Sequence, residues 1–275
     1  MQKSSLFIRH IALPQDHGSW VFLFSPLLIG LFAGGALRLA TLFLVVGALA
    51  AFLVRQPVTM AVKIFSGRRA RRDLPAAWFW TGVYALVGLA ALVGLLALGY
   101  GYLLALAVPG LPVFAWHLAL VARRQERKQA LVEVVGSGVL ALAAPAAYWV
   151  GRGAADPLGW LLFVLAWMQS GASIVYAYLR LEQRSWKAIP ETGEKLRAGR
   201  WALAWSGLNL LAVLGLWLGG ITPGWLGLPF AVQAAEALWG TLHPAAGYKP
   251  TAIGFRQLAV SSLFTLLFII VWGQL

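Results

Sequence analysis

The sequence contains no cysteine, which removes disulfides, thiolate metal ligands and a cysteine nucleophile from consideration. It also has little charge, because only 11% of its 275 residues are Asp, Glu, Lys or Arg, whereas a soluble domain carries about a quarter. Acidic residues are the scarcest group, with 9 Asp and Glu against 22 Lys and Arg. Hydrophobic residues make up 60% of the chain, so its composition does not fit a water-soluble fold.

Long polar segments are also missing. Apolar stretches of about 20 residues recur along the chain, which is the length a helix needs to cross a hydrocarbon core of about 30 Å. We therefore expect an all-α polytopic membrane protein of about nine transmembrane helices, forming a single transmembrane domain over residues 1–275. The expected spans are roughly Gly18–Leu37, Leu39–Ala61, Ala76–Leu98, Tyr102–Val121, Leu131–Val150, Leu158–Leu179, Trp201–Gly220, Trp225–Leu242 and Ala252–Trp272.

The positions of the basic residues predict the orientation. Among the 22 Lys and Arg, all but Arg38 and Arg152 fall in the N-terminal tail, at the end of the second span, or near the loops after even-numbered spans. The positive-inside rule then places the N-terminus in the cytoplasm and the C-terminus outside, in a multi-pass protein of the cytoplasmic (inner) membrane. Short basic loops are typical of contact with anionic lipid head groups, so no nucleic-acid partner is expected.

Polar side chains form stripes within several expected spans. In the sixth span four of them occur at i, i+4, i+7 and i+11, which places them on one helical face. The stripes comprise Gln169, Ser173, Tyr176 and Arg180 in the sixth span, Gln129, Glu133, Gly136 and Ser137 in the fifth, Gln233, Glu236, Gly240 and His243 in the eighth, and Arg55, Thr59 and Lys63 in the second. Because all lie toward the cytoplasmic ends, we expect them to form one polar vestibule there.

A charged residue within the membrane costs about 2.5 kcal/mol or more, so such residues are usually functional or paired. We expect opposite charges among Glu133, Glu236, Arg55 and Arg180 to approach within about 4–6 Å. The alternative is that the arginines reach the interface and the ion pairs only hold helices together. The candidate ligand-binding residues are His17, Arg55, Lys63, Glu133, Tyr176, Arg180, Glu236 and His243.

The sequence indicates neither a catalytic residue nor a metal site. The four histidines are scattered and include no pair at ligand spacing. Ligation of a haem or a metal by His17 and His243 remains open as a minor alternative, and no cofactor is expected.

Several segments resemble the YwiC-like family of bacterial membrane proteins. These are Leu13-Pro14-Gln15-Asp16-His17-Gly18-Ser19-Trp20 with Ser25–Gly30, then Arg55-Gln56-Pro57, Glu133–Gly136 with Ala144–Tyr148, and Tyr176–Arg180. The similarity extends over most of the chain. It implies a membrane protein and no particular activity.

The span count and the polar cytoplasmic mouth also resemble prenyltransferases of the UbiA type, which have nine helices and bind isoprenoid diphosphates. That resemblance implies a UbiA-like bundle. It also implies an Asn-Asp-x-x-Asp-x-x-x-Asp motif in the second helix and an Asp-x-x-x-Asp motif in the sixth, which hold magnesium. Here the second span carries Arg55 and Lys63 and the sixth carries Tyr176 and Arg180, so a magnesium site is not expected. Guanidinium and ammonium groups bind anionic head groups directly.

The leading functional hypothesis is binding of an amphipathic or anionic lipid-like molecule, isoprenoid or quinone-like, at the cytoplasmic-side vestibule. Whether the protein catalyses a reaction is left open, and membrane lipids are its expected surroundings. The first alternative is a transporter of a small solute, which the absence of inverted repeats disfavours. The second is an accessory subunit of a respiratory membrane complex, with a membrane-complex partner on its apolar faces.

Overall fold

The computed structural model describes residues 6–14, 17–125 and 129–273, and for His17 it describes the backbone alone. Every regular element in this part of the chain is helical. The elements are α1 (Arg9–Ala12), α2 (His17–Gly34), α3 (Leu39–Phe65), η1 (Arg71–Asp73), α4 (Leu74–Ala97), η2 (Gly101–Leu106), α5 (Ala107–Ala122), α6 (Ala130–Ala141), α7 (Ala143–Arg152), α8 (Pro157–Gln183), α9 (Thr192–Leu218), η3 (Gly224–Leu226), α10 (Gly227–Leu242) and α11 (Pro250–Trp272).

Each range expected to be a span contains helix, but the structure supports fewer full-length spans than expected. Among the described residues, 7 helical segments are long and apolar enough to cross a membrane by length and composition. The helices α2 and α10 are not among them. Helix α2 is apolar and ends at Gly34, where Gly35 takes a left-handed conformation with φ of 74°. Helix α10 has 16 residues. The chain is thus a multi-pass membrane protein with about seven clear spans.

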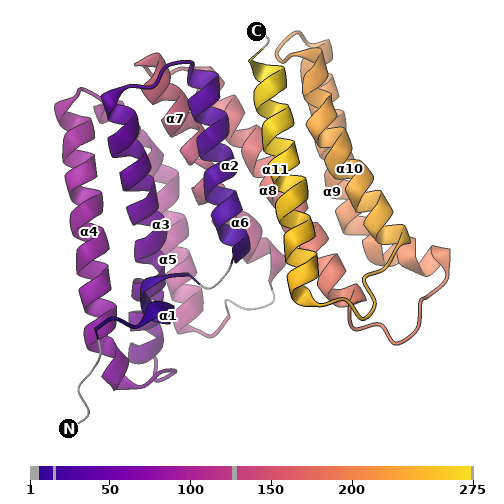
Figure 1. The fold of residues 1–275 in the computed structure, drawn as a ribbon, viewed down its shortest axis with the longest axis horizontal. Coiled ribbons are helices and arrows are strands. Elements are labelled where there is room, and N and C mark those ends of the chain that lie inside the picture. The colour runs from indigo at the N-terminus through magenta and orange to yellow at the C-terminus, as the bar shows by residue number, and fades with distance from the viewer. Residues whose placement is uncertain (1–5, 15–16, 126–128, 274–275) are drawn as a thin grey trace.

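The long helices run side by side, and the N- and C-termini lie at opposite ends of the bundle (Figure 1). Helix α2 packs against α7 and also against α11, while α6 packs against α8. These contacts join the helices of the N-terminal half to those of the C-terminal half. On the N-terminal side, α3 packs mainly against α4, with smaller contacts to α5 and α7.

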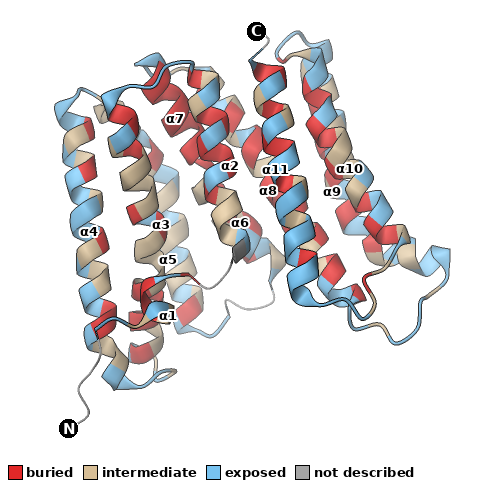
Figure 2. Ribbon diagram, viewed as in Figure 1, coloured by how far each residue is buried: buried red, intermediate tan, exposed pale blue. Residues whose placement is uncertain are grey.

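The centre of the bundle depends on small residues. A Cβ added to Gly30 of α2 would collide with the backbone oxygen of Ala144 on α7 and would lie 2.9 Å from the Cβ of Ala147. One added to Gly34 would lie 2.9 Å from the carbonyl oxygen of Tyr148. Small residues let helix backbones approach closely in a membrane, where van der Waals packing drives helix association. Accordingly α7 is buried along nearly its whole length (Figure 2).

The expected fifth span is divided into α6 and α7. Pro145 has no backbone N–H, and its ring conflicts with the carbonyl group four residues earlier, which belongs to Ala141. Helix α6 ends at Ala141 and α7 begins at Ala143. The two short helices together still count as one membrane-crossing segment, Ala130–Arg152.

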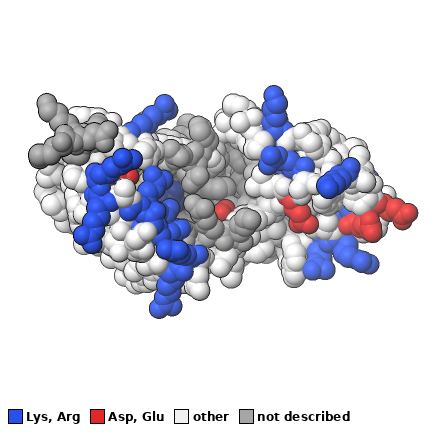
Figure 3. All heavy atoms as spheres, turned by 90° about the horizontal axis from the view of Figure 1, so that it is seen from below, with Lys and Arg blue, Asp and Glu red and all other residues white. Residues whose placement is uncertain are grey.

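The surfaces of the bundle differ in chemistry. Helix α4, at one edge, exposes Leu86, Leu89 and Val93, whose fractional exposures are 69%, 58% and 56% (Figure 2). Apolar side chains on such a face are typical of contact with lipid. Lys and Arg instead gather at the lower end of the bundle, which Figure 3 shows from below.

Candidate functional site

The polar stripe of α8 faces the protein interior, as its spacing predicts. Gln169 and Arg180 are each 2% exposed, Tyr176 is 7% exposed and Ser173 is 9% exposed. Between them these four residues span most of the second half of α8. The prediction of a buried polar face is therefore confirmed, and this face provides one wall of the candidate site.

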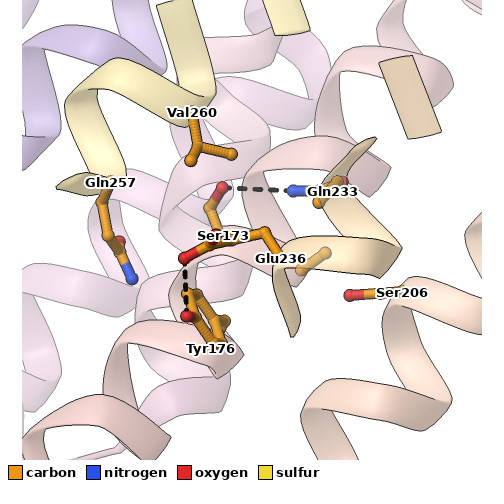
Figure 4. A pocket seen from close by; sticks show the side chains of 8 residues that line it. Ser173, Tyr176, Ser206, Gln233, Glu236, Gln257 and Val260 are labelled. Carbon is orange, nitrogen blue, oxygen red and sulfur yellow. Dashed lines mark hydrogen bonds between the residues drawn. The ribbon is translucent and has the colours of Figure 1, made fainter. Parts of the chain in front are cut away.

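The carboxylate of Glu236 on α10 connects three helices. Tyr176 of α8 donates its hydroxyl hydrogen to Glu236 Oε1 at 2.8 Å (Figure 4). Arg256 of α11 donates from Nε to Oε1 at 2.6 Å and from Nη2 to Oε2 at 2.8 Å, so this ion pair is bidentate. The guanidinium carbon of Arg256 also lies 3.7 Å from the centre of the Trp239 ring.

Arg180 binds the end of α10 and not a carboxylate. Its Nη1 donates to the carbonyl oxygens of Gly240 and His243 at 2.6 and 2.7 Å. A third bond, of 2.8 Å, goes to the side-chain oxygen of Gln183, whose own Nε2 donates to Gly240 at 3.1 Å. The last carbonyls of a helix carry partial negative charge, which a cation stabilises. Backbone dipoles thus stabilise the guanidinium of Arg180, which keeps its net positive charge.

Two adjoining spaces lie between α8 and α11, and the smaller of them is also bordered by α10. The larger, which we name the outer cavity, has a volume of about 220 Å³. The smaller, which we name the inner cleft, measures about 10 Å³ and is also bordered by Ser206 of α9. The outer cavity is lined by Tyr176, Arg180, Tyr248, Ala252, Ile253, Arg256 and Gln257. The inner cleft is lined by Ala172, Ser173, Tyr176, Ser206, Gln233, Glu236, Gln257 and Val260 (Figure 4).

Unpartnered polar atoms are concentrated at the inner cleft. In the described part of the chain, 5 buried side-chain atoms have no hydrogen-bond partner within the protein. Three of them border the cleft: Ser206 Oγ, Gln233 Oε1 and Gln257 Nε2. Gln233 is held in place by its other amide atom, since Nε2 donates to the Gln169 carbonyl at 3.0 Å and to Ser173 Oγ at 3.2 Å.

The other residues predicted for the site lie elsewhere. Glu133 is exposed on α6 and accepts a 2.7 Å hydrogen bond from Tyr178. Arg55 and Lys63 lie on α3, where the Arg55 guanidinium is 5.4 Å from the centre of the Phe52 ring. Neither Arg55 nor Lys63 borders the outer cavity or the inner cleft. Of the eight predicted residues, Tyr176, Arg180 and Glu236 border these two spaces.

Of the two predicted histidines, the structure describes the side chain of His243 alone. His243 is exposed and stacks on Trp239, with ring centres 4.8 Å apart. His17 begins α2, but its side chain lies outside what the structure describes, as do Gln15 and Asp16 of the same segment. Among the described residues no group of three or more His, Asp or Glu could hold a metal ion.

The ion pair that the structure shows at Glu236 involves a residue outside the expected set. Glu236 pairs with Arg256, and Glu133 accepts a hydrogen bond from a tyrosine, whereas an approach within about 4–6 Å was expected among Glu133, Glu236, Arg55 and Arg180. Sequence reasoning counted Arg256 only as a base that sets orientation. Four polar lining residues were missed, namely Ser206, Tyr248, Arg256 and Gln257. The signal that could have found two of them is the adjacent pair Arg256-Gln257 inside an otherwise apolar helix.

Comparison with known proteins finds similarity over the N-terminal half of the chain. Residues 13–148 match the family model described as YwiC-like protein. The uncharacterized protein YwiC of Bacillus subtilis (strain 168) is 27% identical over 152 residues, which cover 55% of this chain. The chain spans 59% of the length of that relative. No solved structure matches.

The match is shorter than the resemblance expected from sequence. It ends within α7, so the segment Tyr176–Arg180, the outer cavity and the inner cleft all lie beyond it. The resemblance to prenyltransferases of the UbiA type is not supported by either comparison.

Proposed function

We propose that this chain, whose residues 13–148 match the YwiC-like family model, binds an amphipathic molecule taken from the membrane. The head group, anionic or quinone-like, occupies the outer cavity. The apolar tail lies against the outer face of α11. The single observation that supports this function best is a cavity of about 220 Å³ lined by two arginines within an apolar bundle.

The charges around the cavity suit such a head group. Arg180 and Arg256 line it, and the carboxylate beside them is that of Glu236. The two arginines and the one carboxylate therefore leave a net charge of one positive unit around the cavity. This excess favours an anion or an electron-rich oxygen. Guanidinium groups bind phosphate, carboxylate and carbonyl oxygens with directional N–H donors. Tyr248 and Gln257 add polar groups to the same wall.

The neighbouring surface suits an apolar tail. Phe255 and Leu258 flank Arg256 on α11, and their exposures are 72% and 44%. Ala252, which lines the outer cavity, is also exposed. A hydrocarbon chain leaving the cavity would therefore meet apolar side chains along α11. Each buried CH₂ of that chain contributes about 0.8 kcal/mol.

We further propose that the chain crosses the membrane nine times, with its N-terminus in the cytoplasm. In this arrangement α2 and α10 cross in addition to the seven long helical segments. The opposite positions of the two termini in Figure 1 and the basic end in Figure 3 support it. The outer cavity then opens to the cytoplasmic leaflet.

The experiment that tests the binding function is native mass spectrometry of protein purified in a gentle detergent. We expect the wild type to retain a small amphipathic molecule that Arg256→Ala loses. Arg256 is the better choice for substitution, because Arg180 also caps α10 and its removal would disturb the fold. The matched control is Arg197→Ala, since Arg197 is exposed on α9 and borders neither space. Equal retention by all three proteins, or retention of bulk lipid alone, would contradict the function.

A further inference from the structure

Arg180 keeps a full positive charge at a buried position beside the outer cavity. It is 2% exposed and is one of the residues that line this cavity. All three hydrogen bonds that it makes to described residues leave from Nη1, two to the carbonyls at the end of α10 and one to Gln183. Its Nε and Nη2 are therefore not used within the described chain. A buried charge is costly unless it is paired and hydrogen-bonded, so these unused donors favour an anion in the cavity.

Arg256 supplies a second guanidinium from α11. It binds Glu236 through Nε and Nη2, and within the described chain Nη1 donates to no acceptor. The guanidinium carbons of Arg180 and Arg256 lie 5.8 and 3.7 Å from the centre of the same Trp239 ring, so they are no farther apart than the sum of these distances. Both side chains line the same cavity. Two helices thus supply one cavity with guanidinium groups that each retain unused N–H donors.

The lining of the outer cavity suits a phosphate better than a neutral carbonyl. Among the described residues that line it there is no carboxylate. A quinone oxygen is uncharged, whereas a phosphate monoester carries about 1.5–2 negative charges at pH 7 and has three strong acceptor oxygens. The cavity volume of about 220 Å³ is far above the roughly 10–15 Å³ that one water needs, so a phosphate and the atoms that join it to a larger molecule fit.

We propose that the outer cavity binds the phosphate group of a phosphomonoester lipid, with Arg180 and Arg256 as its counter-charges. This inference rests on the proposed function and narrows its head group from anionic or quinone-like to phosphate. Glu236 competes with the phosphate, because its carboxylate already occupies two nitrogens of Arg256. Removing the charge of Glu236 should therefore strengthen phosphate binding, an effect that loss of folding cannot produce.

The test is isothermal titration calorimetry of the full-length protein in a neutral detergent. Dioctanoyl phosphatidic acid is the phosphate-bearing probe, and dioctanoylglycerol has the same chains without the phosphate. Decanoate and a decyl-chain quinone supply a carboxylate and a neutral head group. We expect phosphatidic acid to bind at least about tenfold more tightly than these three, which corresponds to about 1.4 kcal/mol. Inorganic phosphate should bind more weakly than phosphatidic acid, since it has no apolar tail to bury.

Two variants change the charge beside the cavity in opposite directions. Glu236→Gln should bind phosphatidic acid about tenfold more tightly than the wild type, because Arg256 loses its charged competitor. Gln257→Glu adds a negative charge to the cavity lining and should weaken phosphatidic acid about tenfold or more. Glu194→Gln is the matched control, because Glu194 is exposed on α9 and borders neither space. It should leave the affinity unchanged.

The outcomes separate this inference from the proposed function. A quinone or decanoate that binds as tightly as phosphatidic acid, and that Arg256→Ala loses, would overturn the inference while the proposed function stands. Inorganic phosphate bound as tightly as phosphatidic acid would support a phosphate site and overturn the amphipathic ligand. Binding of none of the probes would overturn both. Unchanged or weaker binding of phosphatidic acid by Glu236→Gln would also overturn the inference. If Gln257→Glu fails to fold, Glu236→Gln and the series of probes decide the outcome.

Discussion

Arg256 on α11 donates two hydrogen bonds to the carboxylate of Glu236 on α10, from Nε to Oε1 at 2.6 Å and from Nη2 to Oε2 at 2.8 Å. The Glu236 side chain is 12% exposed and the Arg256 side chain is 42% exposed, so the pair lies at the edge of the protein interior. Tyr176 holds the same carboxylate from α8. The geometry of the outer cavity therefore depends on this one ion pair.

Replacing Glu236 with Gln should lower the melting temperature in detergent by a few degrees. The amide oxygen still accepts from Tyr176, but the charge that Arg256 binds is lost. The free energy of unfolding should fall by about 1 kcal/mol, since partial exposure screens the pair. Thermal unfolding of Glu236→Gln beside Arg197→Ala measures this, and equal melting temperatures for the two variants would refute it.

Substituting Gly30 with Ala should destabilise the bundle, because its Cβ would collide with the backbone oxygen of Ala144. Overpacking of this kind costs about 1–3 kcal/mol. Gly82→Ala is the control, as nothing lies within 4 Å of a Cβ there and Ala favours helix over Gly. Fluorescence-detected size-exclusion chromatography after heating compares the two. Equal survival would show that α2 and α7 do not depend on this contact.

Gly240→Ala should impair ligand retention more than folding. Its Cβ would collide with the hydroxyl of Tyr176, which would have to leave Glu236 and shift within the cavity wall. Gly215→Ala on α9 is the matched change, since a Cβ there meets nothing within 4 Å. Native mass spectrometry should find less retained molecule in Gly240→Ala alone. Unchanged retention would mean that Tyr176 does not shape the site.

The orientation predicts where reporters become active. A reporter fused after Leu275 should be active outside the membrane, and one inserted in the loop at Arg68–Arg72 should be active in the cytoplasm. An odd number of crossings separates these two positions from each other. Activity of both reporters on the same side would exclude the nine-crossing arrangement.

Magnesium-dependent prenyl transfer is not expected. Ionisation of an allylic diphosphate needs metal ions held by several carboxylates, and the described residues contain no group of three or more His, Asp or Glu placed to hold one. Incubation with farnesyl diphosphate, magnesium and aromatic acceptors should give no prenylated product. Retention of the bound molecule should likewise be insensitive to a chelator. A product that disappears when chelator is added would disprove this prediction.

Sequence periodicity identified the helices and the inward face of α8, because both can be recognised from the spacing of apolar and polar residues within one segment. It did not identify which helices are neighbours. Arg55 was expected at the same membrane depth as the other predicted site residues. It lies on α3, however, which packs mainly against α4 and not against α8 or α10. Arg256 was missed for the same reason: its importance comes from the contact of α11 with α10, which no local pattern records.

The break between α6 and α7 was foreseeable in part. Pro145 is visible in the sequence, and its effect on Ala141 follows from the geometry of proline. The partner of Glu133 was not foreseeable, because Tyr178 belongs to α8 on a different face from the stripe of Tyr176.

The arrangement around Arg180 has an electrostatic consequence. Because backbone carbonyls at the end of α10 hold its guanidinium, the full charge stays inside the protein without an acidic counter-ion. Neutralising Glu236 would therefore leave Arg180 in position, and the field at the outer cavity would become more positive. The helix terminus fixes Arg180 in place, so the positive charge of Arg180 should stay beside the outer cavity through changes that dismantle the neighbouring ion pair.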